Sequence, residues 1–240
     1  LTIDRIAAFC KIVKKVSPHT LVVVDNCYGE FVEGKEPPQV GADLIMGSLI
    51  KNPGAGMADS GGYIAGKHEL VELAAYRLTA PGVGRDVGAS LGHTRSMFKG
   101  LFFSPHVTGE ALKTAVFAAA LFEHLGYQAM PHWNAPRTDI IETVELGDEK
   151  ALIAFCQGLQ KGSPIDSFVT PEPWDMPGYD SKVIMAAGAF TLGASIELSA
   201  DAPLRPPYAV WMQGGLTFET AKVGVQCAAQ ALLEEGFLSL

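Results

Sequence analysis

Apolar residues in the first part of the chain follow helical and strand-like spacing in turn. Residues 3–16 repeat apolar side chains at helical spacing with lysines between them, which predicts an amphipathic surface helix. The run LVVVD at 21–25 is continuously apolar up to its aspartate, as in a strand buried on both faces of a parallel sheet. We also expect short strands at 42–48 and 61–66, a helix over 67–78 and a glycine-rich loop at 80–94.

The second part of the chain has longer segments in a different order. Residues 104–127 form one long helical pattern, which a glycine and then a proline bring to an end. Alternation of apolar and polar residues predicts strands at 138–146 and 208–215, and residues 183–198 have the length of one long or two short strands. Helices are expected over 147–162 and over 216–236, the second of them beginning near Thr217.

These patterns predict an α/β fold with two domains. Strands and helices alternate up to about residue 104, as in a mostly parallel sheet with helical crossovers. Beyond that point strands and helices are segregated, as in a smaller α+β domain. We therefore place the first domain at 1–104 and the second at 105–240, with the boundary along the long helix.

Composition favours a globular protein over a nucleic-acid or membrane protein. Of the 240 residues 48% are hydrophobic and 18% charged, and the formal net charge of −8 provides no basic stripe for phosphates. The longest uncharged apolar run, 183–196, is too short for a bilayer and contains two glycines. The four cysteines are dispersed, without zinc-ligand spacing, so we expect a cytoplasmic protein with no metal site.

Asp25 and Lys51 are the residues with the most specific chemistry. Asp25 ends the apolar strand, and Lys51 lies in a turn rich in small residues one strand later. Pyridoxal phosphate (PLP) enzymes need this combination, because a lysine amine forms a Schiff base with the cofactor aldehyde and a carboxylate keeps the pyridine nitrogen protonated. Each residue alone is more often a solvated turn lysine or a capping aspartate. Their combination favours a PLP site.

Other motifs compete for the same residues. Ser48 and Lys51 match the S-x-x-K of penicillin-binding enzymes, but the S-D-N and K-T-G motifs of that class are absent. In a PLP site Ser48 would instead donate its hydroxyl to the cofactor phosphate. No Walker A motif occurs, and GVGRDVG (82–88) departs from the dinucleotide-binding pattern.

Long motifs resemble one known family. VVDNCYGEF, GADLIMGSLIKNPGAG with GGYIAG, APGVGRDVGASLG, RSMFKGLFFSPHVTGEALK and SIELSADAPLRPPY resemble the methionine gamma-lyase-like family, also called the aluminium-resistance protein family. The resemblance covers the chain from end to end. It implies a fold-type-I PLP-transferase fold, with Asp25 as the pyridinium partner and Lys51 as the Schiff-base lysine. It also implies that Asn26, Tyr28 and Ser48 line the cofactor.

The resemblance further implies a PLP-dependent carbon–sulfur lyase that acts on a sulfur-containing amino acid by α-proton abstraction and β- or γ-elimination. For the substrate carboxylate we expect an arginine. Arg205 is the first choice, a solvated loop arginine being an equal alternative, and Arg85 and Arg95 are weaker candidates. The partners implied are a small amino-acid substrate and a second copy of the chain, in a homodimer or homotetramer, without nucleic acid or membrane.

Two alternatives remain open at the level of the sequence. Another PLP reaction, such as transamination or aldol cleavage, would use the same aspartate and lysine. A non-catalytic binding or assembly module is the other alternative, because family members carry a further N-terminal stretch with the phosphate-binding turn and the aromatic residue that stacks on the ring. We expect this chain, which begins with Leu, to be a portion of a longer enzyme.

Overall fold

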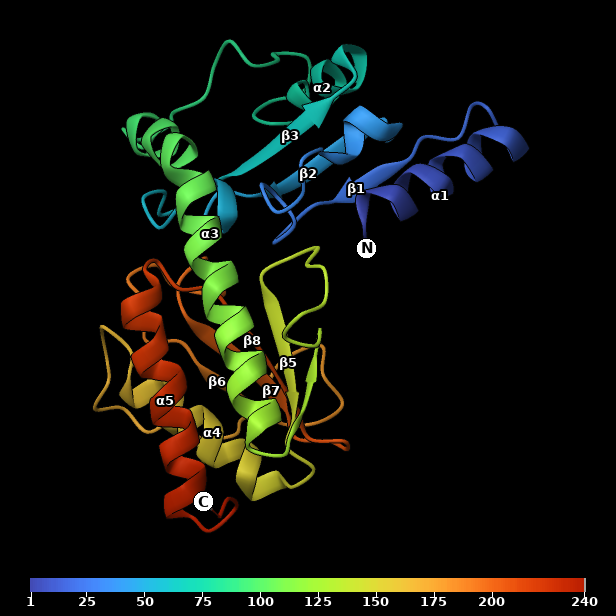
Figure 1. Cartoon of the computed structure of the whole chain (residues 1–240). Helices are drawn as coiled ribbons and strands as arrows, with labels where there is room; N and C mark the ends of the chain where they lie inside the picture. The colour runs from blue at the N-terminus through green and yellow to red at the C-terminus, as the bar shows by residue number, and fades with distance from the viewer. Residues whose placement is uncertain (240) are drawn as a thin grey trace. The chain divides into compact units, whose positions relative to one another are not determined.

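The computed structural model describes residues 1–239. The chain divides into two compact units, Leu1–Pro105 and His106–Leu240. Each unit has its own sheet and its own packed helices, shown in Figure 1. None of the helices in the described residues combines the length and the apolar character that crossing a bilayer requires.

The first unit contains a three-stranded sheet in the order β1–β2–β3. β1 pairs with β2 in parallel, and β2 pairs with β3 antiparallel. The elements of this unit are α1 (Ile3–Val16), β1 (Val23–Asp25), the 3₁₀ turn η1 (Pro37–Val40), β2 (Leu44–Ser48), the 3₁₀ turn η2 (Asn52–Gly54), β3 (Gly62–Gly66) and α2 (His68–Ala75).

A buried aspartate ties together the start of the two parallel strands. The Asp43 carboxylate accepts a hydrogen bond from the Val22 backbone N–H at 2.8 Å. It also forms ion pairs of 2.6 Å with Lys14 at the end of α1 and with Lys67 at the start of α2. These donors hold the pKa of Asp43 far below its usual value. The side chain of Cys10 in α1 packs with Val22 and Ala42 beside this network.

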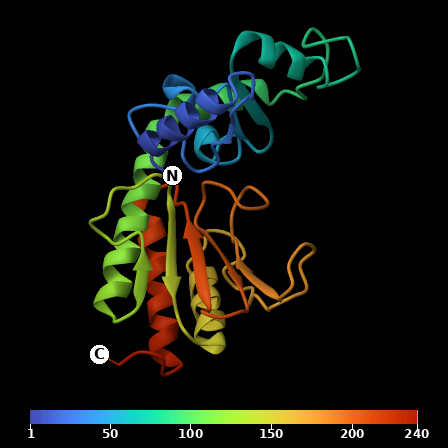
Figure 2. The same ribbon diagram turned by 90° about the vertical axis from the view of Figure 1, so that its right-hand side faces the viewer.

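The second unit is a five-stranded antiparallel sheet in the order β4–β5–β8–β7–β6. Figure 2 shows its sheet with helices packed against one face. The long helix α3 (Thr94–His124) begins in the first unit and continues into the second. The other elements are β4 (Gln128–Met130), β5 (Ile141–Glu145), α4 (Glu149–Lys161), β6 (Val183–Ala186), β7 (Ser199–Pro203), β8 (Ala209–Gln213) and α5 (Phe218–Glu234).

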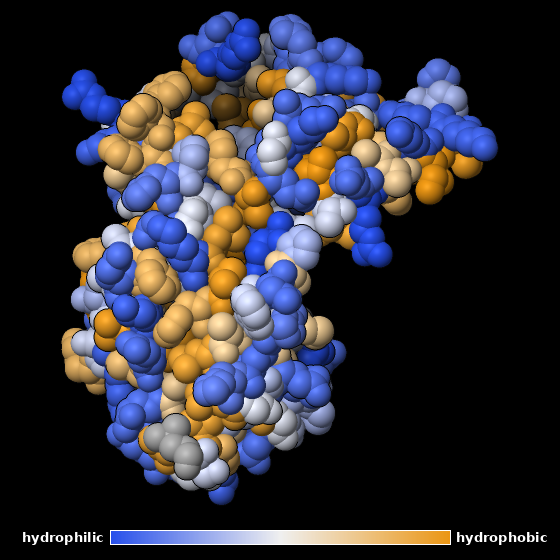
Figure 3. All heavy atoms as spheres, in the orientation of Figure 1, coloured by the Kyte–Doolittle hydropathy of each residue, from blue (hydrophilic) through white to orange (hydrophobic). Residues whose placement is uncertain are grey.

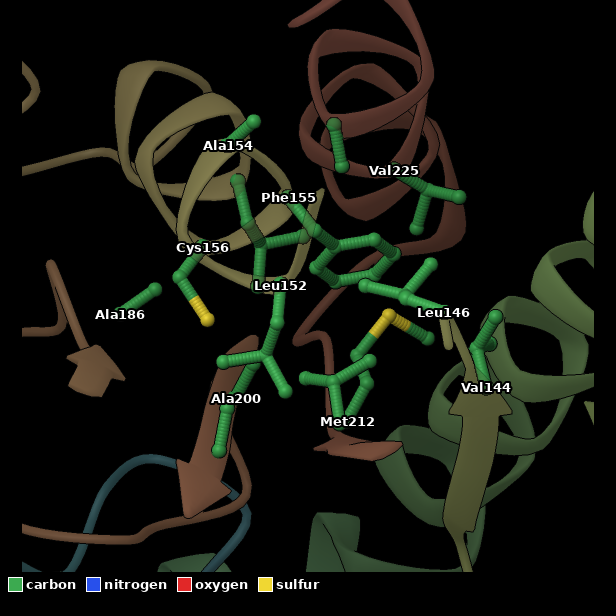
Figure 4. Packing of buried hydrophobic residues seen from close by; sticks show 14 of the residues in the cluster. Val144, Leu146, Leu152, Ala154, Phe155, Cys156, Ala186, Ala200, Met212 and Val225 are labelled. Atoms are coloured by element: carbon green, nitrogen blue, oxygen red, sulfur yellow. The ribbon is translucent and has the colours of Figure 1, made fainter. Parts of the chain in front are cut away.

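The core of the second unit lies between this sheet and the helices α4 and α5. Figure 4 shows Phe155 and Leu152 of α4 against Met212 of β8 and Val144 of β5. The Phe155 ring lies 5.1 Å from that of Phe122 in α3. These side chains are fully buried, so their burial is a main stabilising contribution to the second unit.

Most predicted elements are confirmed, and the α/β class with them. Three differ. α3 begins at Thr94, ten residues before the predicted start, and continues through Pro105 to His124. Strand structure ends at Ala186 rather than covering 183–198, and the next strand begins only at Ser199. One parallel and one antiparallel pair in the first unit do not amount to a mostly parallel sheet.

Replacing Gly158 by Ala should destabilise the second unit. A Cβ at this position in α4 would lie 2.5 Å from the Cys227 carbonyl oxygen of α5 and 2.7 Å from the Ala228 Cα. We expect the overpacking to lower the free energy of unfolding by about 1–3 kcal/mol, measured by urea denaturation. Gly109→Ala in α3 is the matched control, because nothing lies within 4 Å of its added Cβ. It should stabilise the chain by up to about 1 kcal/mol through helix propensity. Equal effects of the two variants would contradict this packing.

Candidate active site

Asp25 lies at the carboxyl end of β1, on an exposed part of the strand. Its Oδ1 accepts a hydrogen bond from the Cys27 backbone N–H at 3.0 Å. This bond and donation by the Cys27 thiol hold the pKa of Asp25 below its usual value, and the positive charge of Lys51 adds to the effect. Asp25 is therefore a carboxylate near neutral pH, exposed and able to pair with a further cation.

Lys51 lies three residues beyond the carboxyl end of β2, where it caps the 3₁₀ turn η2. Its backbone N–H donates to the Ser48 carbonyl at 3.3 Å. The ammonium Nζ lies 4.3 Å from the centroid of the Tyr28 ring. Because β1 and β2 are parallel, their carboxyl ends meet at one edge of the sheet, and this brings Asp25, Tyr28 and Lys51 together.

The lysine turn is packed too closely for larger residues. A Cβ on Gly54 would lie 1.6 Å from the Leu49 carbonyl oxygen, so only glycine fits there. The Ser104 hydroxyl of α3 donates to the Pro53 carbonyl at 2.6 Å. The side chain of Asn52 is fully buried and donates to the carbonyl oxygens of Tyr28 and Glu30 at 3.0 Å each. The turn that carries Lys51 is thus fixed from several directions.

A buried glutamate lies behind the lysine turn. Tyr63 of β3 donates its hydroxyl to Glu30 Oε1 at 2.7 Å, while Oε2 has no hydrogen-bond partner among residues 1–239. Apolar side chains, including Leu49 and Phe98, line a cavity of about 430 Å³ beside it. Burial raises the pKa of Glu30 to about 7 in spite of the hydrogen bond from Tyr63.

The other predicted cofactor residues have different surroundings. Ser48 ends β2, and its hydroxyl accepts a hydrogen bond from the Ile50 N–H at 3.4 Å. The amide Nδ2 of Asn26 donates to Glu36 Oε2 at 2.7 Å, so this side chain is engaged in the network around Glu30. The contact of Asn26 with a cofactor stays a prediction.

The three arginines considered for the substrate carboxylate are all exposed. Arg205 is exposed and belongs to the second unit, in the turn that precedes β8. Arg85 lies exposed in the glycine-rich loop, and Arg95 lies at the exposed start of α3. Their roles stay predictions.

Sequence reasoning missed Cys27, Glu30, Asn52 and Tyr63. Burial raises the pKa of the Cys27 thiol, and its hydrogen bond to Asp25 raises it further, so the thiol keeps the proton that it donates. Cys27 and Glu30 stand in the same nine-residue motif as Asp25, and Asn52 directly follows Lys51. Proximity to the predicted pair was the signal that could have identified them. Tyr63, thirty-three residues from Glu30, gave no such signal.

Comparison with known proteins shows the family of the chain. The model of the methionine gamma-lyase family matches residues 1–233. The chain belongs to the methionine gamma-lyase family. It is 52% identical to the uncharacterized protein YnbB of Bacillus subtilis (strain 168) over 233 residues, which cover 97% of this chain and 55% of YnbB. It is 53% identical to an uncharacterized 33.9 kDa protein of Lactobacillus delbrueckii subsp. bulgaricus, with 96% of this chain and 76% of that protein covered.

Solved structures of family relatives have the same fold. A carbon–sulfur lyase involved in aluminium resistance from Clostridium novyi NT is 50% identical, with a TM-score of 0.92 over 97% of this chain and 54% of that one. A protein from Listeria monocytogenes, whose name links it to cystathionine beta-lyase and aluminium resistance, is 52% identical with a TM-score of 0.93, over 96% and 57% of the two chains. The chain thus spans about half the length of these relatives and of YnbB.

More distant structures agree in fold alone. Cystathionine gamma-lyase from yeast is 13% identical, with a TM-score of 0.57 over 93% of this chain and 60% of that one. Serine palmitoyltransferase from Sphingomonas wittichii is 14% identical with the same TM-score, over 98% and 52% of the two chains. Enzymes of different reactions thus share this architecture, and the reaction has to be argued from the site.

Replacing Glu30 by Gln should flatten the pH dependence of stability. The folded chain keeps a proton on Glu30 that the unfolded chain releases between about pH 4.5 and pH 7, so the free energy of unfolding falls as the pH rises through this window. The fall is up to about 3 kcal/mol, since one pKa unit is worth about 1.4 kcal/mol. Thermal unfolding across this window measures it.

About half of the slope should remain in Glu30→Gln. Glu142 in the second unit also has its pKa raised to about 7 by burial, in spite of its ion pair with Arg137 at 2.6 Å. Glu72→Gln, a substitution at an exposed position of α2, is the control and should leave the slope as in the wild type. An unchanged slope in Glu30→Gln would contradict the assignment.

Proposed function

We propose that this chain is part of a PLP-dependent carbon–sulfur lyase that acts on a sulfur-containing amino acid by β- or γ-elimination. Asp25 and Lys51, which the parallel pairing of β1 and β2 brings to the same end of the sheet in a member of the methionine gamma-lyase family, carry the proposal. The name of the Clostridium novyi relative, a carbon–sulfur lyase, supports the reaction class. The fold-type-I PLP-transferase fold is part of the same proposal, in which the parallel pair β1–β2 belongs to a larger, mostly parallel sheet of the whole enzyme.

The chemistry of the residues around Lys51 fits PLP. Lys51 provides an amine for the aldehyde, at the edge of the sheet where two parallel strands end. Asp25 provides an ionised, exposed carboxylate for a protonated ring nitrogen. Ser48 accepts its hydrogen bond from Ile50, which leaves its own hydroxyl proton to donate to a phosphate.

When bound, PLP supplies an aldehyde that bonds to amines and a pyridinium ring that withdraws electrons from the substrate Cα. The Asp25 carboxylate would hold the proton on the ring nitrogen. The Lys51 amine would hold the aldehyde carbon and, once displaced by the substrate amine, would take the proton from the substrate Cα. Arg205 would bind the substrate carboxylate through its guanidinium. Loss of the thiol would leave an enamine, which one water molecule hydrolyses to a keto acid and ammonia.

Borohydride reduction in the presence of PLP should modify Lys51. We expect a yellow protein and, after reduction and proteolysis, a mass increase on the peptide that contains Lys51, because only an amine bonded to the aldehyde is reduced to a stable product. Lys51→Arg should lose this modification. Asp25→Asn should bind PLP about ten- to a hundredfold more weakly, the range expected when a hydrogen bond to a charged group is lost.

Lys35, an exposed lysine of the same unit, provides the internal control and should remain unmodified at a PLP concentration that saturates Lys51. Because the chain spans about half the length of YnbB, the same experiment is made on a version extended at its N-terminus. If neither version is modified at Lys51, the enzyme proposal is wrong and a non-catalytic module takes its place. Release of keto acid with ammonia, as opposed to amino transfer, then identifies the lyase.

The same proposal includes assembly into a homodimer or homotetramer. The start of α3 exposes a group of large apolar side chains, and Figure 3 shows hydrophobic residues gathered on this part of the first unit. Phe98 is 69% exposed and Phe102 is 79% exposed, which is unusual for surface aromatics without a partner. These side chains support an interface with a second copy of the chain.

Sedimentation velocity should give a mass two or four times the 25.5 kDa of the chain. Changing Phe98 and Phe102 together to Ser should shift the protein toward the monomer, because the apolar area that drives association is removed. Leu192→Ser, which changes a 92% exposed side chain in the second unit, should leave the mass unchanged. A monomeric wild type at micromolar concentration would contradict this part of the proposal.

A further inference from the structure

Asn52 connects two turns that meet at the carboxyl edge of the parallel strand pair. It directly follows Lys51, and its side chain is fully buried. The amide Nδ2 donates to the carbonyl oxygens of Tyr28 and Glu30, at 3.0 Å each. Because both partners are acceptors, the NH₂ group and not the amide oxygen has to face them, which fixes the orientation of the side chain. The lysine turn and the turn after β1 are thus joined through one residue.

The turn that Asn52 holds has an unfavourable backbone conformation. Tyr28 has a φ of 71°, in the left-handed region that a residue with a Cβ seldom adopts. Such a conformation persists only where surrounding contacts determine it. The hydrogen bonds to the carbonyls of Tyr28 and Glu30 are contacts of this kind, and they come from a side chain that is itself immobilised by burial.

The conformation of this turn determines where the Tyr28 ring lies. The ring centroid is 4.3 Å from the Lys51 Nζ, within the distance of a cation–π contact. The negative face of the ring attracts the Lys51 ammonium, and this contact has to be given up before the amine reacts. The neutral amine is the nucleophile, so the position of Tyr28 bears on how readily Lys51 reacts.

We infer that Asn52 is a positioning residue: by holding the turn from Tyr28 to Glu30, it keeps the Tyr28 ring over the amine of Lys51. This inference deepens the proposed function, since it concerns the lysine to which the cofactor would bond. The contacts themselves are independent of the cofactor. Tyr28 and Asn52 therefore have different roles. Tyr28 contacts the Lys51 amine directly, and Asn52 acts on it through Tyr28.

A positioning role and a merely structural role predict different results. If Asn52 only stabilised the fold, Asn52→Ala would lower the melting temperature and loosen the lysine turn whether or not residue 28 carried a ring. If Asn52 acts through Tyr28, its replacement should have no further effect on Lys51 once the ring is gone. A double-mutant cycle between the two residues distinguishes these cases.

Acetylation by a trace of acetic anhydride, without PLP, measures the reactivity of Lys51 in the full 240-residue chain. Mass spectrometry follows the Lys51 peptide relative to those of Lys35 and Lys67. Tyr28→Leu should speed the acetylation of Lys51 about two- to fivefold, the range that a partly exposed cation–π contact gives. Asn52→Ala should give a similar increase, and the double variant should be no faster than either single one. Lys35 and Lys67 should react as in the wild type.

Two results would overturn the inference. One is an unchanged rate at Lys51 in Asn52→Ala; the other is a rate in the double variant equal to the product of the two single effects. If Asn52→Ala does not fold, Asn52→Ser replaces it in the cycle with the same expectations. Tyr28→Phe, which keeps the ring, should react like the wild type. Because no cofactor is present, a chain that fails to bind PLP still answers the question, so failure of the proposed function and failure of this inference are distinguishable.

Discussion

The parallel register of β1 and β2 is the constraint from which the candidate site follows. Val23, Val24 and Asp25 pair with Leu44, Ile45 and Met46. The register is fixed at its start by the Asp43 carboxylate, which bonds to the Val22 N–H, and at its end by the Asn26 N–H, which donates to the Met46 carbonyl at 2.9 Å. A shift by one residue would turn the Asp25 carboxylate to the opposite face of the sheet, away from Lys51.

Two carboxyl groups near the lysine turn, those of Asp25 and Glu30, have pKa values shifted in opposite directions. Asp25 lies on the exposed side, where hydrogen bonds and Lys51 favour its charge. Glu30 is buried, and desolvation raises its pKa to about 7, so it is mostly neutral in mildly acidic solution. These two carboxyl groups, five residues apart in sequence, therefore differ in charge at the same mildly acidic pH, because only Glu30 is buried. Asn52, which follows Lys51 in the sequence, donates a hydrogen bond to the Glu30 carbonyl oxygen.

The sequence was sufficient for what depends on local pattern. Helical spacing located α1, α4 and α5, and apolar runs located β1 and β8, since both signals arise from residues close in the chain. The start of α3 was missed because a serine followed by a proline is typical of a helix start, whereas here both residues lie inside the helix. Asp25 and Lys51 were recognisable from type and spacing. The contact of Glu30 with Tyr63, by contrast, depends on β3 pairing with β2, which no local pattern states.

The position of Asp25 on an outer strand has a consequence for the solution behaviour of the chain. β1 is the first strand of its sheet, and within the described residues one of its edges has no neighbouring strand. Val23 on this strand is 46% exposed, and an open apolar edge is a template on which strands of other molecules add. The negative charge of Asp25, at the end of β1, opposes the addition of such strands. Neutralising Asp25 would therefore lower solubility as well as alter the site, and a colloidal effect of this kind would be present even in a chain that performs no chemistry.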